Sequence, residues 1–493
     1  MEKIISKNRY QKKGSALAYA LIIMAIVLII LTSMLSYIAS QIKFSSNRAD
    51  REEAFQIAEA GIYFYRWYLA HETAGEDSEA VDDFWQNGNP LGVDSSYIQA
   101  FSDPEGGEIG EYEIEVEAPN PGTSVAIVKS TGWTYKNPDL KRIVQVRFRR
   151  PSWSEYAVLA NDIMRFGENT EVFGKVHSNY GIRFDGLAHN IISSSVATYD
   201  DPDHSGDNEF GVHTHVKPPP LTGTDNSFQE DEAPPSLVQD RPDVFEVGRE
   251  FPSPIISFNG LINDLNYLKN EAQNGQGVYY DNSKCGNKKN YGRHIILNGD
   301  TMTVSTVINY NNANFSIKDE DCILTNVPIP QDGIVFVENN IWLQGTINGR
   351  RTTFVAANLE GGSPAGIYLG MDNLLYTNFD GSDIIGILAQ DDIEIVKDSL
   401  DDLTIDAALL SQSGRVGRNY YTPFGCSSQS CEDHKGTITI NGALASFLRY
   451  GFAYTNGTGY NYRILNFDNN LLYFPPPYFP TGKNYFIDLW EEL

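Results

Sequence analysis

The sequence contains little cysteine, little positive charge and none of the common enzyme motifs. Its 493 residues include four cysteines, too few for a scaffold held together by disulfides. Lysine and arginine number 37 against 64 acidic residues, which gives a net charge of −27. Binding to nucleic acid needs cations opposite phosphates, so we expect no direct nucleic-acid ligand. HExxH, GxSxG, P-loop and Rossmann glycine patterns are missing, which favours a protein that is not an enzyme.

The residues that are abundant indicate β structure. The chain has 28 tyrosines and 42 glycines, a composition typical of strands joined by tight turns. Apolar residues make up 41% and aromatic residues 12%, which excludes an intrinsically disordered polymer. A chain of this length is expected to contain more than one domain.

The N-terminus combines a basic stub with a long uncharged run. Residues 1–14 hold five basic side chains and one glutamate, and residues 15–42 carry no formal charge. As a helix this run would be about 42 Å long, which exceeds the ~30 Å hydrocarbon core of a membrane. The apolar region of a secretory signal peptide is only about 7–15 residues long. We therefore predict a single membrane-spanning helix with a cytoplasmic N-terminus.

The helical pattern continues beyond the uncharged run. In residues 43–70, apolar side chains recur at helical spacing at Ala54, Ile57, Ala58 and Ile62, with charged residues between them. The sequence therefore predicts one continuous helix over 15–70, transmembrane in its first half and amphipathic in its second.

Two stretches of this helix resemble a known family. The junction KKG|SALAYALIIM resembles the leader junction of type IV prepilins, and RADREEAFQIAEAGI is similar to the PilX-like N-terminal domain of minor pilins. The resemblance implies a leader over 1–14, cleavage after Gly14 by the prepilin peptidase and methylation of Ser15. It also implies insertion in the cytoplasmic membrane and assembly with other pilin subunits and pilus machinery into an extracellular pilus.

One residue departs from the family pattern. Most pilins carry glutamate as the fifth residue after the cleavage point, where this chain has Tyr19. That carboxylate is thought to neutralise the amino terminus of a neighbouring subunit, because an unpaired charge in an apolar bundle is costly. The departure favours a minor or tip subunit over a major pilin. The alternative is a plain signal-anchor helix that tethers an external domain.

The exterior is predicted to be mainly β. Residues 71–108 are acidic and turn-rich and are expected to form a connector. Within 109–150, three stretches alternate with a period of two, which predicts a small antiparallel β head. Short apolar strands separated by Gly and Asn over 151–493 predict a large right-handed β-helix or solenoid-like region. A β-sandwich is the alternative.

Two segments of this external region are distinct. An insertion over 190–330 contains proline-rich linkers and one expected amphipathic helix at 257–273. The aromatic, proline-containing segment 472–493 is expected to lie across the edge of the solenoid and cover exposed strand groups.

The four cysteines all follow the membrane helix, and an exterior location favours disulfides. Cys426 and Cys431 flank a short polar loop and are expected to pair, which leaves Cys285 with Cys322. Four unpaired buried thiols are the alternative. The CxxC-like spacing of a thiolate zinc site is absent.

An acidic stretch resembles the beginning of a calcium loop, but the match is incomplete. Its twelfth position should be a bidentate glutamate and is Val212, so we expect a solvated acidic loop and no cofactor. His213 and His215 are two residues apart and would share one face of a strand. The candidate calcium ligands are Asp201, Asp203, Ser205 and Asp207.

Carboxylate pairs raise the alternative of a polysaccharide-active enzyme, because β-helices often house lyases and hydrolases. Each pair lies in a turn sequence, where aspartate typically accepts hydrogen bonds from the backbone. We therefore expect pilus assembly and surface presentation, with cell adhesion through a surface ligand, and no catalytic residue. A membrane-anchored carbohydrate-binding adhesin is the alternative. The pairs are Asp380 with Asp383, Asp391 with Asp392, and Asp401 with Asp402.

Overall fold

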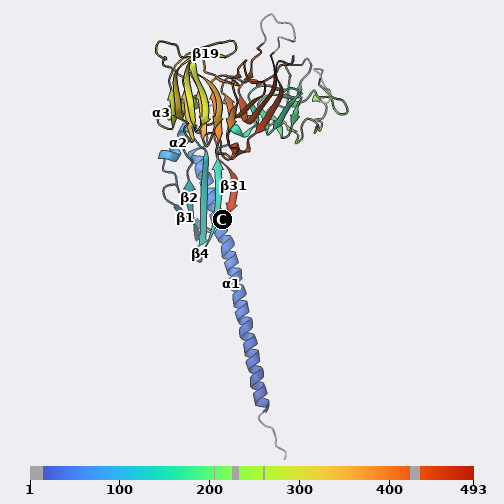
Figure 1. The fold of residues 1–493 in the computed structure, drawn as a ribbon. Helices are drawn as coiled ribbons and strands as arrows, with labels where there is room; N and C mark the ends of the chain where they lie inside the picture. Colours follow the sequence, from blue (N-terminus) through green and yellow to red (C-terminus); the bar gives the residue numbers. More distant parts are fainter. Residues whose placement is uncertain (1–14, 205, 225–231, 259–260, 422–432) are drawn as a thin grey trace, which may run out of the picture.

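The computed structural model describes residues 15–204, 206–224, 232–258, 261–421 and 433–493. Helix α1 (Ser15–Glu72) is 58 residues long and projects from the β-rich remainder as a rod (Figure 1). The expected continuous helix is therefore confirmed. It is long and apolar enough to cross a membrane.

Five strands form an antiparallel head sheet beside the second half of α1 (Figure 1). Strands β2, β3 and β4 occupy the three stretches in which alternation predicts a meander, and their antiparallel pairing confirms it. The order is β1 (Tyr97–Ser102), β2 (Glu108–Glu117), β3 (Val125–Thr134), β4 (Asn137–Arg149) and β31 (Phe486–Glu492).

Only one face of the head sheet is covered. In β2, Tyr112, Ile114 and Val116 are buried and alternate with more exposed residues, most of them glutamates. The buried side chains pack in one core with Ile57 and Ile62 of α1. Because the other face meets solvent, the strands alternate between apolar and polar residues, and this alternation makes them recognisable in the sequence.

Strand β31 corrects the expected position of the C-terminal segment. Tyr478 and Phe479 do pack on the outer face of the large sheet described below. The final strand leaves that region and pairs antiparallel with β4. Arg147 reaches Asp488 there at 2.6 Å, across a sequence separation of 341 residues. A local sequence pattern carries no information about so distant a partner.

The connector region 71–108 contains two regular elements. Helix α2 (Ser78–Asn87) begins after Asp77, whose carboxylate accepts a hydrogen bond from the Ala80 amide at 2.9 Å. Val81 and Trp85 of α2 are buried in the head core. Edge strand β1 follows. Both elements are too short for their periodicity to stand out in the sequence.

Most of the remaining chain forms a 21-stranded sheet in which coils stack in parallel. Parallel pairing between coils confirms a solenoid-like region and disfavours the β-sandwich, whose sheets are antiparallel. The right-handed sense of the coil stays a prediction. The longest ladder runs β16 (Gly277–Tyr280), β20 (Gly333–Val337), β22 (Arg351–Ala356), β25 (Ile384–Ala389), β27 (Leu403–Ser411), β29 (His434–Ser446), β5 (Val158–Ala160), β8 (Val176–Ser178), β11 (Ile192–Ser194) and β15 (Arg249–Glu250).

Two further parallel ladders continue the coils. Strand β21 pairs with β23 through Ile341 and with β24 through Ile347, so it turns from one ladder to the next. One ladder runs β17 (Gly292–Gly299), β21 (Asn340–Ile347), β23 (Ile367–Leu369), β26 (Ile393–Ile395) and β28 (Val416–Arg418). The other links β24 (Leu374–Tyr376) through β27 and β29 to β30 (Gly459–Phe467), β7 (Thr170–Phe173) and β10 (Leu187–Ala188).

The order of coils in space differs from their order in the chain. Val158 of β5 lies opposite Leu444 of β29, so the first coils of the region stack on its last ones. In Figure 1 the green first coils accordingly lie beside the red last ones, and the yellow β16–β19 region lies at the other end. The coils also differ in length. Gly333 pairs with Thr352, 19 residues on, whereas Arg351 pairs with Ile384, 33 residues on. Such spacing leaves no repeat period to detect.

The parallel strands are buried on both faces. In β25, Ile385 and Ile387 point into the main core, and Ile384 and Leu388 pack into a second, outer cluster. Helix α3 (Leu261–Gln273) contributes Leu265 and Leu268 to that outer cluster and confirms the helix expected at 257–273. Because both faces are covered, these strands appear in the sequence as continuous apolar runs.

The remaining elements lie outside the parallel ladders. Strands β18 (Thr301–Tyr310) and β19 (Ile317–Pro328) extend β17 as an antiparallel sheet, with β19 at its edge. Two small sheets lie near the first coils: the hairpin β12 (Thr198–Tyr199) with β13 (Glu209–Phe210), and β14 (Val212–His213), β9 (Ile182–Phe184) and β6 (Met164–Phe166). Short 3-10 helices span Trp153–Glu155 and Asn469–Leu472.

Candidate functional site

The first half of α1 presents an exposed apolar surface. Large apolar side chains from Leu17 to Phe44 are all at least 46% exposed. Farther along the same helix, Ala54, Ile57 and Leu69 are fully buried beneath the head sheet. Exposing so large an apolar surface to water is unfavourable, so the exposed half needs an apolar environment. The helix therefore fits membrane anchoring.

The predicted processing junction lies at the start of this half. Gly14 is outside the described residues, and Ser15 is the first residue of α1. Tyr19, which occupies the position of the pilin glutamate, is 66% exposed among aliphatic neighbours. Residues 15–42 contain no Asp or Glu, so the exposed half brings no carboxylate into an apolar environment.

Glycines allow the second half of α1 to approach the head sheet closely. A Cβ on Gly132 of β3 would lie 2.4 Å from both the Ala54 carbonyl oxygen and the Ala58 amide nitrogen. A Cβ on Gly61, the last residue of the AEAG stretch, would lie 2.3 Å from the Ser130 hydroxyl oxygen. The small residues on α1 therefore set the depth at which the helix lies on the sheet.

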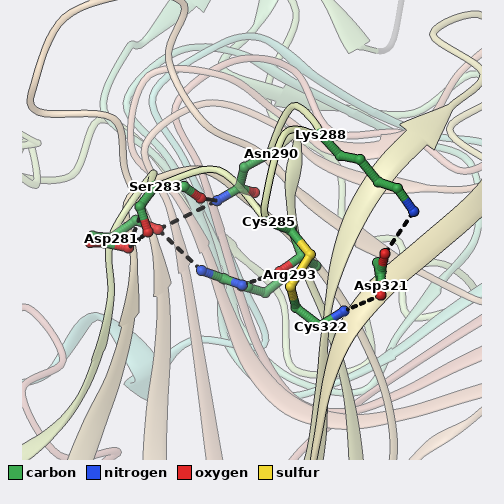
Figure 2. The surroundings of a disulfide bond; sticks show 9 residues. Asp281, Ser283, Cys285, Lys288, Asn290, Arg293, Asp321 and Cys322 are labelled. Atoms are coloured by element: carbon green, nitrogen blue, oxygen red, sulfur yellow. Dashed lines mark hydrogen bonds and ion pairs between the residues drawn. A yellow bond between two sulfur atoms is a disulfide. The ribbon is translucent and has the colours of Figure 1, made fainter.

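The cysteines fall in two groups. Cys285 and Cys322 form a disulfide with Cα atoms 6.1 Å apart. It joins the loop before β17 to the edge strand β19, next to the ion pair of Lys288 and Asp321 at 2.6 Å (Figure 2). Cys426 and Cys431 lie outside the described residues, so their pairing stays a prediction.

The candidate calcium ligands do not gather at one point among the described residues. Asp201 is buried and lies near His213 and His215. The Asp203 carboxylate instead contacts Arg165 at 3.5 Å and Arg449. Asp207 is exposed, and Ser205 is outside the described residues. The carboxylates of Asp201 and Asp203 therefore contact different partners, although both belong to the same loop.

The paired aspartates accept hydrogen bonds from the backbone, as their turn sequences predict. Asp383 accepts from the Thr377 and Asn378 amides at 2.9 and 2.7 Å. Asp392 accepts from the Arg415 amide at 2.8 Å. Asp402 likewise accepts from the Thr437 amide at 3.0 Å. These bonds give the carboxylates a role in joining neighbouring coils.

A polar cleft of about 780 Å³ lies where β7, the loop before β30 and the 200–204 loop meet. It is the feature that the sequence did not indicate, because its residues come from six separate segments. Four arginines line it in an otherwise acidic protein, together with aromatic side chains. The lining includes Arg165, Arg415, Arg449, Arg463, Tyr450, Tyr454 and Tyr460.

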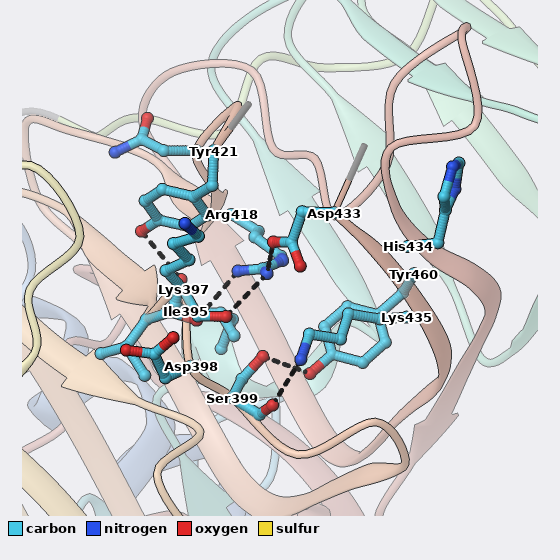
Figure 3. A network of polar contacts seen from close by, with 12 residues as sticks. Ile395, Lys397, Asp398, Ser399, Arg418, Tyr421, Asp433, His434, Lys435 and Tyr460 are labelled. Atoms are coloured by element: carbon cyan, nitrogen blue, oxygen red, sulfur yellow. Dashed lines mark hydrogen bonds and ion pairs between the residues drawn. The ribbon is translucent and has the colours of Figure 1, made fainter. Parts of the chain in front are cut away.

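Buried polar contacts hold the wall of this cleft. The Tyr460 hydroxyl donates to the Ser399 hydroxyl at 2.9 Å, and Lys435 donates to the Ser399 carbonyl at 2.7 Å (Figure 3). Nearby, Arg418 donates to the Val396 carbonyl at 2.9 Å and pairs with Asp433. The Tyr460 side chain in the cleft lining is therefore held by a neighbouring coil.

A buried glutamate lies behind the cleft. Glu394 is 1% exposed and accepts hydrogen bonds from the Tyr421 hydroxyl at 2.8 Å and from the Asn419 amide. Burial raises the pKa of Glu394 to about 7, although Arg415, 3.3 Å away, acts in the opposite direction. The charge of this wall of the cleft therefore changes near neutral pH.

Comparison with known proteins finds a family resemblance in the N-terminal region. Residues 13–62 match the family model of the PilX N-terminal region, which confirms the resemblance seen in the junction and the AEAG stretch. No curated protein matches the chain. A solved structure, the competence-associated pilin ComZ from Thermus thermophilus, aligns at 12% identity over 90% of this chain and 98% of that one. Its TM-score of 0.31 gives this alignment no weight for fold or function.

Proposed function

We propose that this chain is a minor type IV pilin-like subunit that takes part in pilus assembly. The prepilin peptidase removes residues 1–14, the new amino terminus at Ser15 is methylated, and α1 passes from the cytoplasmic membrane into a bundle of pilin helices. The observation that carries this proposal is the division of α1 into an exposed apolar half and a half buried under the head sheet. The PilX N-terminal match covers both halves.

Two features support a position at or near the filament tip. Tyr19 supplies no carboxylate to neutralise the amino terminus of a neighbouring subunit. The large parallel region between β4 and β31 also adds bulk beyond the head, which a closely packed shaft would have to accommodate at every subunit. A single subunit at the end of the filament avoids both problems.

The processing step is tested by mass spectrometry of the native amino terminus. We expect a methylated Ser15 in wild-type cells and an intact leader in the Gly14→Ala variant. Cells that lack the prepilin peptidase provide the control, because wild-type protein should keep its leader there. A plain membrane anchor would have the same mass in all three samples, and that result would contradict the proposal.

The tip position is tested by restoring the missing carboxylate. In Tyr19→Glu we expect more copies of the chain per filament, counted by quantitative mass spectrometry of sheared filaments. Tyr37→Glu is the matched control, since Tyr37 has the same 66% exposure on the same apolar half. Equal copy numbers in Tyr19→Glu and wild type would remove the argument from Tyr19.

The cleft supports a second candidate function, surface presentation of a binding site for an acidic saccharide. Arginines pair with carboxylates, and aromatic rings such as that of Tyr454 pack against sugar faces. The match of residues 13–62 to the PilX N-terminal region suggests a structural, non-enzymatic protein. Binding of the full-length chain to arrays of acidic and neutral glycans tests this function. Equal binding to both classes, or to neither, would contradict it.

A further inference from the structure

A second group of polar side chains lies buried near the first coils, between the hairpin β12–β13 and strand β14. Asp201 and Glu209 are each 1% exposed, and His213 and His215 are fully buried. The side chain of His204 is 2% exposed beside Glu209. Polar and charged groups at this depth are costly unless each one has a partner.

Three of these residues converge on one point. The ligand atoms of Asp201, His213 and His215 all lie within 4.8 Å of one another. The His213 Nε2 atom lies 3.7 Å from the Asp201 Oδ2 atom, which is too far for a hydrogen bond. Two ligands of a tetrahedral zinc ion, each about 2.0–2.1 Å from the metal, lie about 3.4 Å apart. The separation thus suits two ligands of one metal better than a donor and its acceptor.

His213 supplies an independent observation. Neither of its ring nitrogens has a hydrogen-bond partner among the described residues, although the side chain is fully buried. A neutral imidazole has one N–H and one lone pair, and each buried group left without a partner costs about 1–3 kcal/mol. A metal bound to the Nε2 lone pair would remove the cost at that nitrogen.

Carboxylates gather around this group. Asp185, Asp201 and Glu209 are buried there, and the Arg183 guanidinium lies beside them. Arg183 donates to Asp185 at 2.7 Å and lies 3.8 Å from Asp201. Buried carboxylates favour a bound cation, because each buried negative charge needs a partner.

We propose that Asp201, His213 and His215 bind one divalent transition-metal ion of the zinc class. Two imidazoles and a carboxylate are donors that zinc accepts, whereas calcium prefers oxygen ligands only. The ion holds the 200–204 loop against β14. The same loop carries Asp203, which contacts Arg165 and Arg449 at the wall of the cleft, so the ion stabilises the shape of the cleft.

The proposal is tested on the full-length chain in detergent, purified without a histidine tag. The protein is loaded with zinc sulfate and dialysed, and its zinc content is measured by mass spectrometry. We expect one zinc ion per chain, and a content near zero in His213→Ala and in Asp201→Asn. The affinity should fall by more than the roughly 10–100-fold that loss of an outer-shell partner causes.

His177→Ala is the matched control, because His177 is 3% exposed and lies on β8 with its own partners, Ser193 and Asn179. This variant should keep one zinc ion. Failure of wild type to bind zinc, or an unchanged zinc content in His213→Ala, would overturn the proposal.

X-ray absorption of zinc-loaded wild type tests the proposal without any variant. We expect nitrogen and oxygen scatterers only, with the outer-shell pattern of two imidazoles. Sulfur in the first shell would place the metal on cysteine and contradict the assignment. Circular dichroism of the variants separates loss of a ligand from loss of the fold.

Discussion

The head sheet and the parallel sheet bury their strands in different ways. In the head, α1 covers one face, the neighbouring strands β1 to β4 are close in sequence, and apolar residues alternate with charged ones. In the parallel region, strands such as β25 are covered on both faces and pair with strands about 20–35 residues away. The head depends on helices packed against one face of its sheet, whereas each coil depends on its neighbours on either side.

A large truncation inside the parallel core should have the largest effect. Phe354 of β22 is fully buried, so Phe354→Ala should lower the free energy of unfolding by about 3–5 kcal/mol. Hydrogen exchange followed by mass spectrometry should show loss of protection in neighbouring coils, with the head unchanged. Tyr462→Ala, at a 51% exposed position on β30, is the control and should change little. Equal loss of protection in both regions would mean that they unfold as one unit.

The corresponding change in the head is a side chain at the helix–sheet contact. Gly132→Val places a branched side chain where Ala54 and Ala58 leave no room, and should destabilise the head by about 3 kcal/mol. Exchange should increase in residues 54–69 of α1, while the coils keep their protection. Gly107→Ala serves as the control, since a Cβ there meets no atom within 4 Å. Unchanged hydrogen exchange in α1 would show that the helix moves away from the sheet far enough to accommodate the valine side chain.

The parallel region should lose stability as pH rises. Burial raises the pKa of Glu394 to about 7, above its ordinary value of 4.5, so the folded state holds its proton more tightly than the unfolded state. The stabilisation is therefore full below about pH 4.5 and is lost as pH rises through 7, by about 2–3 kcal/mol. Glu394→Gln should abolish this slope in chemical denaturation between pH 4.5 and 8. Glu117→Gln, on the exposed side of β2, is the control and should keep the pH dependence of stability.

The edge of the head sheet should respond to pH in the opposite direction, with a smaller effect. Burial alone would raise the pKa of Asp488, but hydrogen bonds and charges from Arg147 and Arg149 outweigh it and lower that pKa. The stabilisation is present above about pH 3.8 and is lost as pH falls further. Asp488→Asn should cost about 1 kcal/mol at neutral pH, because solvent screens a pair at a sheet edge. Hydrogen exchange of the β31 amides measures this loss of stability. Glu491→Gln, on the same strand, is the control and should leave their exchange unchanged.

The sequence by itself determined the elements whose partners are near. The uncharged run at 15–42 and the period of 3.6 after it determine α1, and alternation determines β2, β3 and β4, since each pattern reflects one covered face. The short apolar runs after Pro151 indicated stacked strands because those strands are covered on both faces. Cys285 with Cys322 was only the pairing that remained if Cys426 pairs with Cys431, and the structure contains that disulfide.

Tertiary structure alone decided the contacts between distant segments. It places β31 in the head sheet, β5 beside β29, and Asp201 beside His213 instead of beside Asp207. It also assembles the arginines of the cleft. These contacts depend on which coil stacks on which, and uneven coil lengths leave no periodic signal of that order in the chain.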